Sequence, residues 1–166
     1  TVLLSMPYMM LLPMFTEDIL DVGARGMGVL VSVSGIGAMA GSIVLASLPN
    51  KKRGLMLLVG SLILGVGLVG FSFSSMWFSS FAWPAALGFI VIVGIGQTTR
   101  MTLGNTLLQY YVLDEYRGRV MSLYMMEFGL TSFGVFAAGV LADAVGVEWA
   151  VGGLAIVLIL VCVLGL

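Results

Sequence analysis

Long stretches without a charged residue constrain this chain more than any other feature of its sequence. Residues 1–16, 26–50 and 54–99 contain no Asp, Glu, Lys or Arg. A helix rises about 1.5 Å per residue, so a helix that crosses about 30 Å of hydrocarbon needs roughly 20 mostly apolar residues. The uncharged runs are therefore suited to membrane spans, and residues 54–99 are long enough for two of them.

The composition agrees with a lipid-facing protein and excludes several other classes. Hydrophobic residues make up 60% of the chain and charged residues 9%, whereas soluble domains carry about 45–50% and about 25%. With one Cys and no His, the chain cannot form an internal disulfide or a structural zinc site with nitrogen and sulfur ligands. A net charge of −1 and dispersed cations argue against nucleic-acid binding. We expect no metal, no cofactor and, without His as a general base, no enzymatic activity.

The charged residues divide the chain into predicted transmembrane helices within a single all-α domain, residues 1–166. A helix satisfies its own backbone hydrogen bonds, as a membrane span requires. The turn inside the longest uncharged run is predicted at residues 72–84, where serines, Trp77, Trp83 and Pro84 are typical of the membrane interface. The six predicted spans are residues 1–16, 26–49, 54–73, 84–112, 119–142 and 148–166.

The positive charges predict how these helices are oriented. Most of the cations lie in the loops after the second and the fourth predicted spans, at Lys51, Lys52, Arg53, Arg117 and Arg119. By the positive-inside rule, these loops are cytoplasmic. With six spans, both chain ends are then also cytoplasmic.

The fourth predicted span is the most polar, and it holds the candidate site. Arg100 lies inside this span and Glu127 inside the fifth. A charged side chain at the bilayer centre costs about 2.5–3.5 kcal/mol, so Arg100 is expected to point into the bundle or a wet cavity and to have a partner. Measured from the cytoplasmic helix ends, the two residues differ in height by about 5 Å. The other candidate substrate or coupling residues are Gln97, Asn105 and Gln109.

Three roles for Arg100 stay open at this stage. A static ion pair with Glu127 would fix the register of two helices. The same pair could instead belong to a substrate or proton-coupling site. Arg100 could also extend its long side chain to the cytoplasmic interface.

Glycines and prolines predict how the first two spans are shaped. In the second span, Gly37 and Gly41 form a GxxxG pair, which is typical of close helix packing. Pro7 and Pro13 in the first span each remove a backbone donor, which predicts a bent helix. Bent helices line transporter cavities but also occur without any role in transport, and both interpretations stay open.

Three segments of the chain, and the order in which they occur, resemble those of a known protein family. They are PYMMLLPMFTEDILDVGARGMGVLVSVSGIGAMAG, NTLLQYYVLDEYRGRVMSLY and GVLADAVG, of which residues 114–124 are the most specific. In this order they resemble the C-terminal half of a major facilitator superfamily transporter, and the nearest branch is the macrolide-efflux and enterobactin-exporter group. The resemblance covers nearly the whole chain. It implies that the predicted spans are helices seven to twelve of a twelve-helix bundle.

The resemblance also implies a function. Such proteins are secondary transporters that work by alternating access, and this branch exports amphipathic small molecules such as drugs or siderophores from a bacterial cell through its inner (plasma) membrane. The implied partners are membrane lipids, the N-terminal six-helix half of the same transporter or a second copy of this chain, a small-molecule substrate and, as a candidate coupling ion, protons. The resemblance places a cytoplasmic gating loop at Asp114, Glu115, Arg117, Gly118 and Arg119.

A different class of function stays open beside this one. The chain could be a stand-alone or truncated six-span membrane protein with a structural or regulatory role and no transport of its own.

Overall fold

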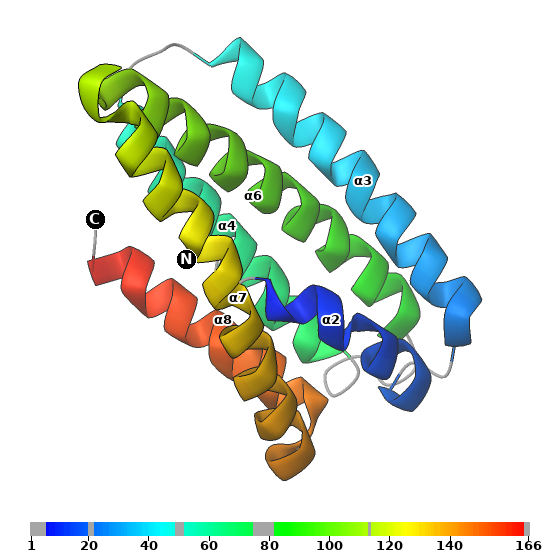
Figure 1. The fold of residues 1–166 in the computed structure, drawn as a ribbon. Coiled ribbons are helices and arrows are strands. Elements are labelled where there is room, and N and C mark those ends of the chain that lie inside the picture. Colours follow the sequence, from blue (N-terminus) through cyan, green and yellow to red (C-terminus); the bar gives the residue numbers. More distant parts are fainter. Residues whose placement is uncertain (1–5, 20–21, 49–51, 75–81, 113, 165–166) are drawn as a thin grey trace.

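The computed structural model of the chain is a bundle of long helices (Figure 1). It describes residues 6–19, 22–48, 52–74, 82–112 and 114–164. The elements in these ranges are all helical, which confirms the predicted all-α class. They are α2 (Pro7–Met14), the π-helix η1 (Phe15–Ile19), α3 (Gly23–Ser47), α4 (Arg53–Ser72), α6 (Ala82–Tyr111), the 3-10 helix η2 (Asp114–Tyr116), α7 (Arg117–Val145) and α8 (Val147–Leu164).

Five helices in the described part of the chain are long and apolar enough to cross a membrane, and they are α3, α4, α6, α7 and α8. The chain is therefore an integral membrane protein. The first predicted span, residues 1–16, lies partly outside the described residues, so the count of six spans stays a prediction. The predicted turn at residues 72–84 overlaps the connection between α4 and α6, but Trp83 and Pro84 belong to the first turn of α6. Trp77 lies outside the described residues.

The two prolines of the first helical segment act differently. Pro7 begins α2, where a missing N–H removes no helical hydrogen bond. Pro13 lies inside α2 and removes such a bond, and the chain then widens into η1. The Thr16 hydroxyl donates to the carbonyl of Pro13 (2.9 Å), and the Val22 N–H donates to the carbonyl of Thr16 (3.0 Å). Only Pro13 thus interrupts the regular helix, and the disruption expected from Pro7 is wrong because Pro7 lies at the helix start.

α4 is the centre of the bundle because its glycines let helices approach from two sides. A Cβ added at Gly67 would lie 3.0 Å from Cγ2 of Val93 in α6. On the other side, a Cβ added at Gly65 would lie 2.6 Å from Cγ1 of Ile159 in α8. Small residues of this kind drive helix association in lipid, where burial of apolar surface contributes little.

The apolar core lies where α4, α6 and α8 meet α2 and η1. The rings of Phe15 and Phe71 pack with their centroids 4.5 Å apart, and Leu64, Ile90 and Leu158 are fully buried beside them. These elements thus share one core, and it anchors the short helix α2 against the long ones.

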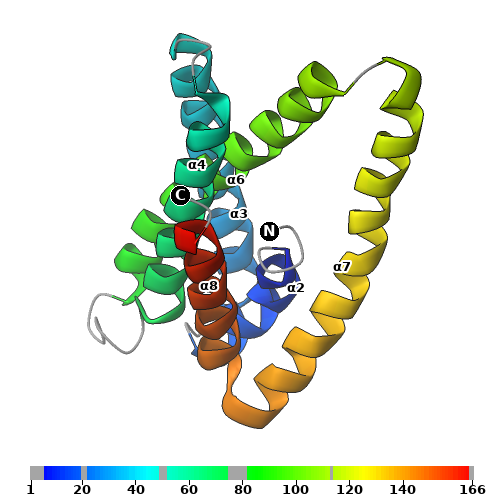
Figure 2. The same ribbon diagram turned by 90° about the vertical axis from the view of Figure 1, so that its left-hand side faces the viewer.

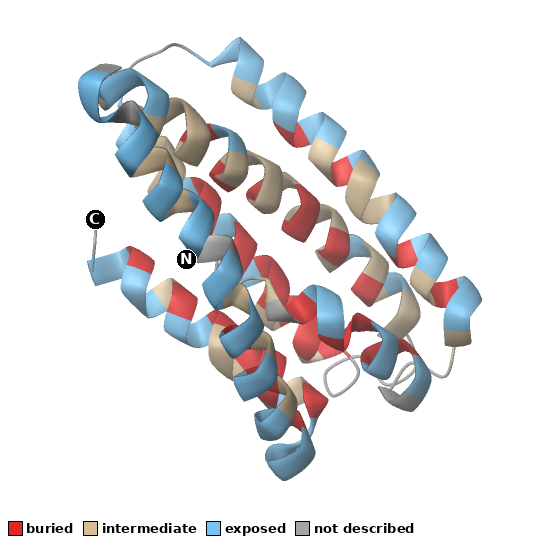
Figure 3. Ribbon diagram, in the orientation of Figure 1, coloured by how far each residue is buried: buried red, intermediate tan, exposed pale blue. Residues whose placement is uncertain are grey.

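α3 and α7 form the outside of the bundle. Figure 2 shows α7 diverging from α6, and Figure 3 shows exposed residues along most of α3 and α7. Within an 18-residue apolar window of each helix, 17% of the residues of α3 and 18% of those of α7 are buried, against 44% of those of α4. The exposed side chains include Ile36, Met39, Phe133 and Phe136. An apolar surface of this extent fits contact with lipid or with another helix bundle rather than with water.

Several cations of the described residues lie at one end of the bundle. α3 ends there, α4 begins, α6 ends and α7 begins (Figure 1). We call this end, with Lys52, Arg53 and Arg119, the basic end; Lys51 lies outside the described residues. α3 begins and α7 ends at the opposite end, where Arg25 and Asp143 are exposed.

The packing of α3 on α6 gives the first testable prediction. A Cβ at Gly37 would collide with the carbonyl of Val91, whereas a Cβ at Gly35 would meet nothing within 4 Å. Gly37→Ala is expected to lower the free energy of unfolding by about 1–3 kcal/mol, as overpacking typically does, and the thermal midpoint in detergent measures this. Gly35→Ala is the matched control and should leave the midpoint unchanged or raise it, because Ala favours helix. Equal losses for both variants would contradict this packing.

Candidate functional site

The candidate site lies within α6, and Arg100 is its centre. The Arg100 side chain is 4% exposed, and no other charged side chain among the described residues is buried. α6 holds it in place because glycines bring the helix close to both neighbours. Gly96 of α6 lies against the backbone of Leu64 in α4, and Gly94 lies against the carbonyl of Ser34 in α3.

Tyr8 of α2 lies within electrostatic range of Arg100 of α6. Tyr8 is 5% exposed, and the guanidinium charge acts on its hydroxyl group. A phenol can accept a hydrogen bond from a guanidinium, and its ring can bind a cation. Our sequence analysis missed Tyr8 as a site residue. The signal was a hydroxyl-bearing side chain between two prolines in an otherwise apolar segment.

Gln97 lies three residues before Arg100 and therefore on the same face of α6. Its side-chain oxygen is buried and accepts no hydrogen bond from the described residues. A buried amide oxygen without a partner costs about 1–3 kcal/mol. We call Gln97, Arg100 and Tyr8 the polar cluster, because these polar side chains are covered by an otherwise apolar bundle.

The other two polar candidates of α6 lie outside this cluster. The Asn105 side-chain amide donates to the carbonyl of Met101 (3.1 Å), so it is engaged with its own helix. Gln109 is exposed in the last turn of α6, at the basic end. The structure therefore brings Gln97 to Arg100 and leaves Gln109 about nine residues, or about 13 Å, further along the helix.

The side chain of Glu127 lies outside the described residues, so its pairing with Arg100 stays a prediction. The α7 backbone places Glu127 about 15 Å from the turn that joins α6 and α7, and Arg100 lies about 16 Å from the same turn. The two residues are thus nearly level. Tyr124 and Thr131, one turn on either side of Glu127, are partly covered. That face of α7 is therefore turned towards the bundle, although the α6 and α7 backbones diverge beyond the turn (Figure 2).

The predicted gating loop forms the corner between α6 and α7. Asp114 and Glu115 belong to η2, and Arg117, Gly118 and Arg119 form the first turn of α7. Glu115 and Arg119 are exposed, while the side chains of Asp114 and Arg117 lie outside the described residues. The gating contacts stay a prediction.

The predicted packing pair faces α6. Gly37 and Gly41 are both buried, and a Cβ at Gly41 would lie 3.0 Å from the Cα of Ile95. Gly94 of α6 completes this contact from the other side, and our sequence analysis missed it. The sequence feature that could have indicated this contact is the closely spaced glycine pair at residues 94 and 96.

These features define a class of protein. Several membrane-spanning helices, a polar cluster buried among them and an ionisable side chain near the middle of a span are typical of proteins that move solutes across a bilayer. The family model of the Major Facilitator Superfamily matches residues 1–166, and the chain belongs to this superfamily. Its members are membrane transporters rather than enzymes. No curated protein and no solved structure matches the chain. The resemblance to the superfamily is thus confirmed, and the branch within it stays a prediction.

The interaction of Tyr8 with Arg100 gives the second prediction. In a double-mutant cycle of Tyr8→Phe and Arg100→Met, the free energies of unfolding in detergent should deviate from additivity by about 1 kcal/mol, as expected for two groups whose charges and dipoles interact. A cycle of Tyr8→Phe with Arg119→Met is the control. Arg119 is exposed at the basic end, so these changes should add to within about 0.5 kcal/mol. Additive behaviour of Tyr8 and Arg100 would show that the two side chains do not interact.

Proposed function

We propose that the protein exports amphipathic small molecules, such as drugs or siderophores, by alternating access, with this chain forming one wall of the substrate pathway. The observation that carries the proposal is the burial of Arg100 beside Gln97 and Tyr8 within apolar helices. A buried charge in a span costs several kcal/mol and is retained in membrane proteins chiefly where substrates or ions pass.

The surroundings of Tyr8 support an amphipathic substrate. Tyr8 also lines an apolar cavity of about 210 Å³ between α2, α3 and α6, together with Met9, Leu12, Met27 and Ile90. Ile90 precedes Arg100 by about 15 Å along α6. The apolar part of a substrate would lie in this cavity, where flexible methionines adapt to different shapes. Its acidic or hydrogen-bonding part would lie at Arg100, because a guanidinium binds carboxylate and similar groups in a planar, two-point contact.

Alternating access requires a second set of helices. The exposed apolar faces of α3 and α7 are the surfaces that such a partner would cover. We propose that the partner is the N-terminal six-helix half of the same transporter, or else a second copy of this chain. Rocking of the two halves would open the cluster to one side at a time. The corner at η2 would face the cytoplasm in this arrangement, and Glu127 is the candidate for carrying a coupling proton.

The transport role of Arg100 gives the third prediction. In cells that lack their own exporters, Arg100→Leu in the protein at its full natural length should reduce export of a dye or macrolide about tenfold or more, because hydrogen bonds to charged groups contribute about 1.5–3 kcal/mol. Surface expression is measured in parallel. Arg25→Leu removes an exposed cation at the opposite end and is the matched control, which should export normally. Normal export by Arg100→Leu would exclude a substrate-binding role.

A paired substitution separates binding from a purely structural ion pair. If the pair with Glu127 only fixes helix register, Arg100→Leu should lower expression, and adding Glu127→Leu should restore both expression and export, because neither charge is then left unpaired. If the cluster binds substrate, the double variant should be expressed but inactive. If the wild-type protein moves no tested compound, the structural or regulatory alternative gains support.

The proposed orientation gives the fourth prediction. The only Cys, Cys162, is buried in α8, and Cys162→Ala provides a cysteine-free background. Single cysteines at Lys52 or Glu115 should be labelled by a membrane-impermeant maleimide only after the cells are opened, whereas a cysteine at Asp143 should be labelled from outside. All three positions are exposed. Labelling of position 52 in intact cells would reverse the proposed orientation.

A further inference from the structure

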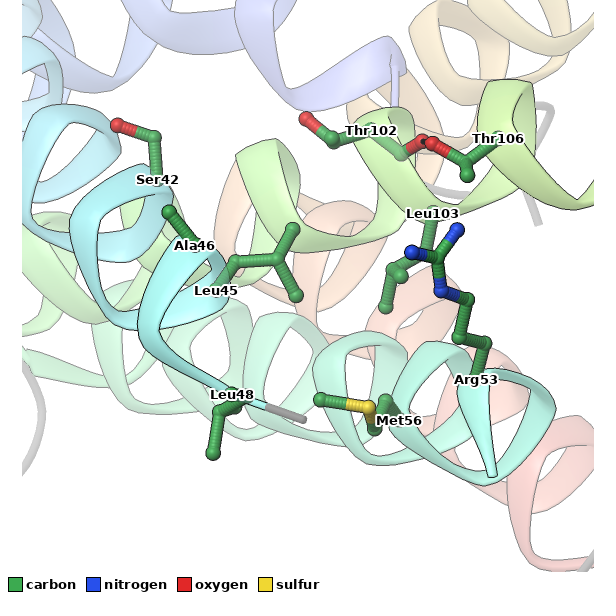
Figure 4. A pocket seen from close by; sticks show the side chains of 9 residues that line it. All are labelled: Ser42, Leu45, Ala46, Leu48, Arg53, Met56, Thr102, Leu103 and Thr106. Atoms are coloured by element: carbon green, nitrogen blue, oxygen red, sulfur yellow. Dashed lines mark hydrogen bonds between the residues drawn. The ribbon is translucent and has the colours of Figure 1, made fainter. Parts of the chain in front are cut away.

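A second cavity, with Arg53 and two threonines in its lining, lies at the basic end of the bundle. It has a volume of about 250 Å³ and is enclosed by α3, α4 and α6. Thr102 follows Arg100 by two residues, which is about 200° around the helix, so the two side chains point in nearly opposite directions. Figure 4 shows the Arg53 side chain extending from α4 towards Leu103 and Thr106 of α6. Because its lining includes none of Tyr8, Gln97 and Arg100, the cavity is distinct from the proposed substrate site.

A larger cavity adjoins it and shares Arg53 as a wall. Its volume is about 360 Å³, and its other lining residues are Lys52, Gly54, Tyr110 and Tyr111. The two tyrosine rings pack edge to face with centroids 5.3 Å apart, and each side chain is 76% exposed. Exposed aromatic residues at the end of a membrane span are typical of the lipid headgroup region.

An apolar groove continues from the first cavity along the bundle. It has a volume of about 310 Å³ between α3 and α4, and α6 forms its floor. Leu45, Leu48 and Met56 line both the cavity and the groove. From Leu55 to Ile63 the groove follows α4 for about 12 Å, which is close to the hydrocarbon depth of one leaflet, about 15 Å.

We propose that this continuous surface binds an anionic phospholipid, with its phosphate between Lys52 and Arg53 and an acyl chain in the groove between α3 and α4. The charges are complementary, since the described residues that line the cavities and the groove include two cations and no acidic side chain. Arginine binds phosphate through paired hydrogen bonds. The first N–H groups of α4, at whose start Arg53 lies, also favour an anion.

The groove distinguishes a lipid from a free phosphate group. A soluble anion would use the two cations and leave the groove uncovered, whereas a lipid places its phosphate and its acyl chain in adjoining sites. Basic pockets between transmembrane helices are known to bind anionic headgroups on the cytoplasmic side. Lipid binding at this surface requires that the protein lies in a membrane but not that it transports a substrate. It can therefore be tested independently of the proposed function.

The experiment uses the protein at its full natural length in phosphatidylcholine nanodiscs with or without phosphatidylglycerol. Native mass spectrometry counts retained phosphatidylglycerol, and the thermal midpoint reports stabilisation. The wild-type protein should retain the anionic lipid and gain stability from it. Replacing both cations, Lys52→Gln with Arg53→Gln, should weaken retention about tenfold or more. Arg25→Gln removes a cation at the opposite end and should leave retention unchanged.

Two further arms test the lipid assignment itself. Val59→Trp fills the exposed groove without altering a charge and should reduce phosphatidylglycerol retention. Because it leaves the cations in place, this variant remains informative if the double variant folds poorly. Glycerol 3-phosphate should not displace the lipid. Wild-type retention by both the double variant and Val59→Trp would overturn the proposal, and displacement by glycerol 3-phosphate would replace it with a soluble-anion site.

Discussion

The close approach of α6 to α3 and α4 is the contact on which the rest of this structure depends. Lipid is as apolar as the helix surfaces, so helices in a membrane associate through tight packing rather than through removal of apolar surface from water. Glycines on all three helices supply that packing. Gly37 and Gly41 of α3 lie against the α6 backbone, and Gly67 of α4 lies against Val93. A larger side chain at these positions would separate the backbones.

This contact decides which way the polar residues of α6 point. Gly94 of α6 lies against α3 and Gly96 lies against α4, and Gln97 and Arg100 follow within the next turn, where Arg100 is 4% exposed. The prolines of α2 determine where the helix that carries Tyr8 begins and where it becomes irregular. Pro7 begins the short helix that carries Tyr8, and Pro13 interrupts it near its end. Tyr8 and Met9 of the same helix line the apolar cavity. Packing, polarity and backbone irregularity thus converge on one region of the bundle.

Much of this arrangement could be predicted from the sequence. The charge-free runs located the long helices, because a hydrocarbon core excludes charged side chains for about 20 residues. The height of Arg100 followed from counting residues, and the GxxxG pattern marked Gly37 and Gly41. Tyr8 and Gly94 were missed for a common reason. Each acts on a residue of another helix, and the spacing of residues along one helix carries no information about its neighbours.

The sequence by itself determined that the chain is helical and lies in a membrane, and where most of its helices begin and end. These properties are local, since they depend on how a continuous stretch of residues interacts with lipid and on the hydrogen bonds within one helix. Only the tertiary structure decided that Tyr8 approaches Arg100, that Asn105 turns to its own backbone, and that Arg53 borders two cavities at the basic end. The rotation of each helix about its axis settles such contacts, and it is set by packing against several neighbours at once.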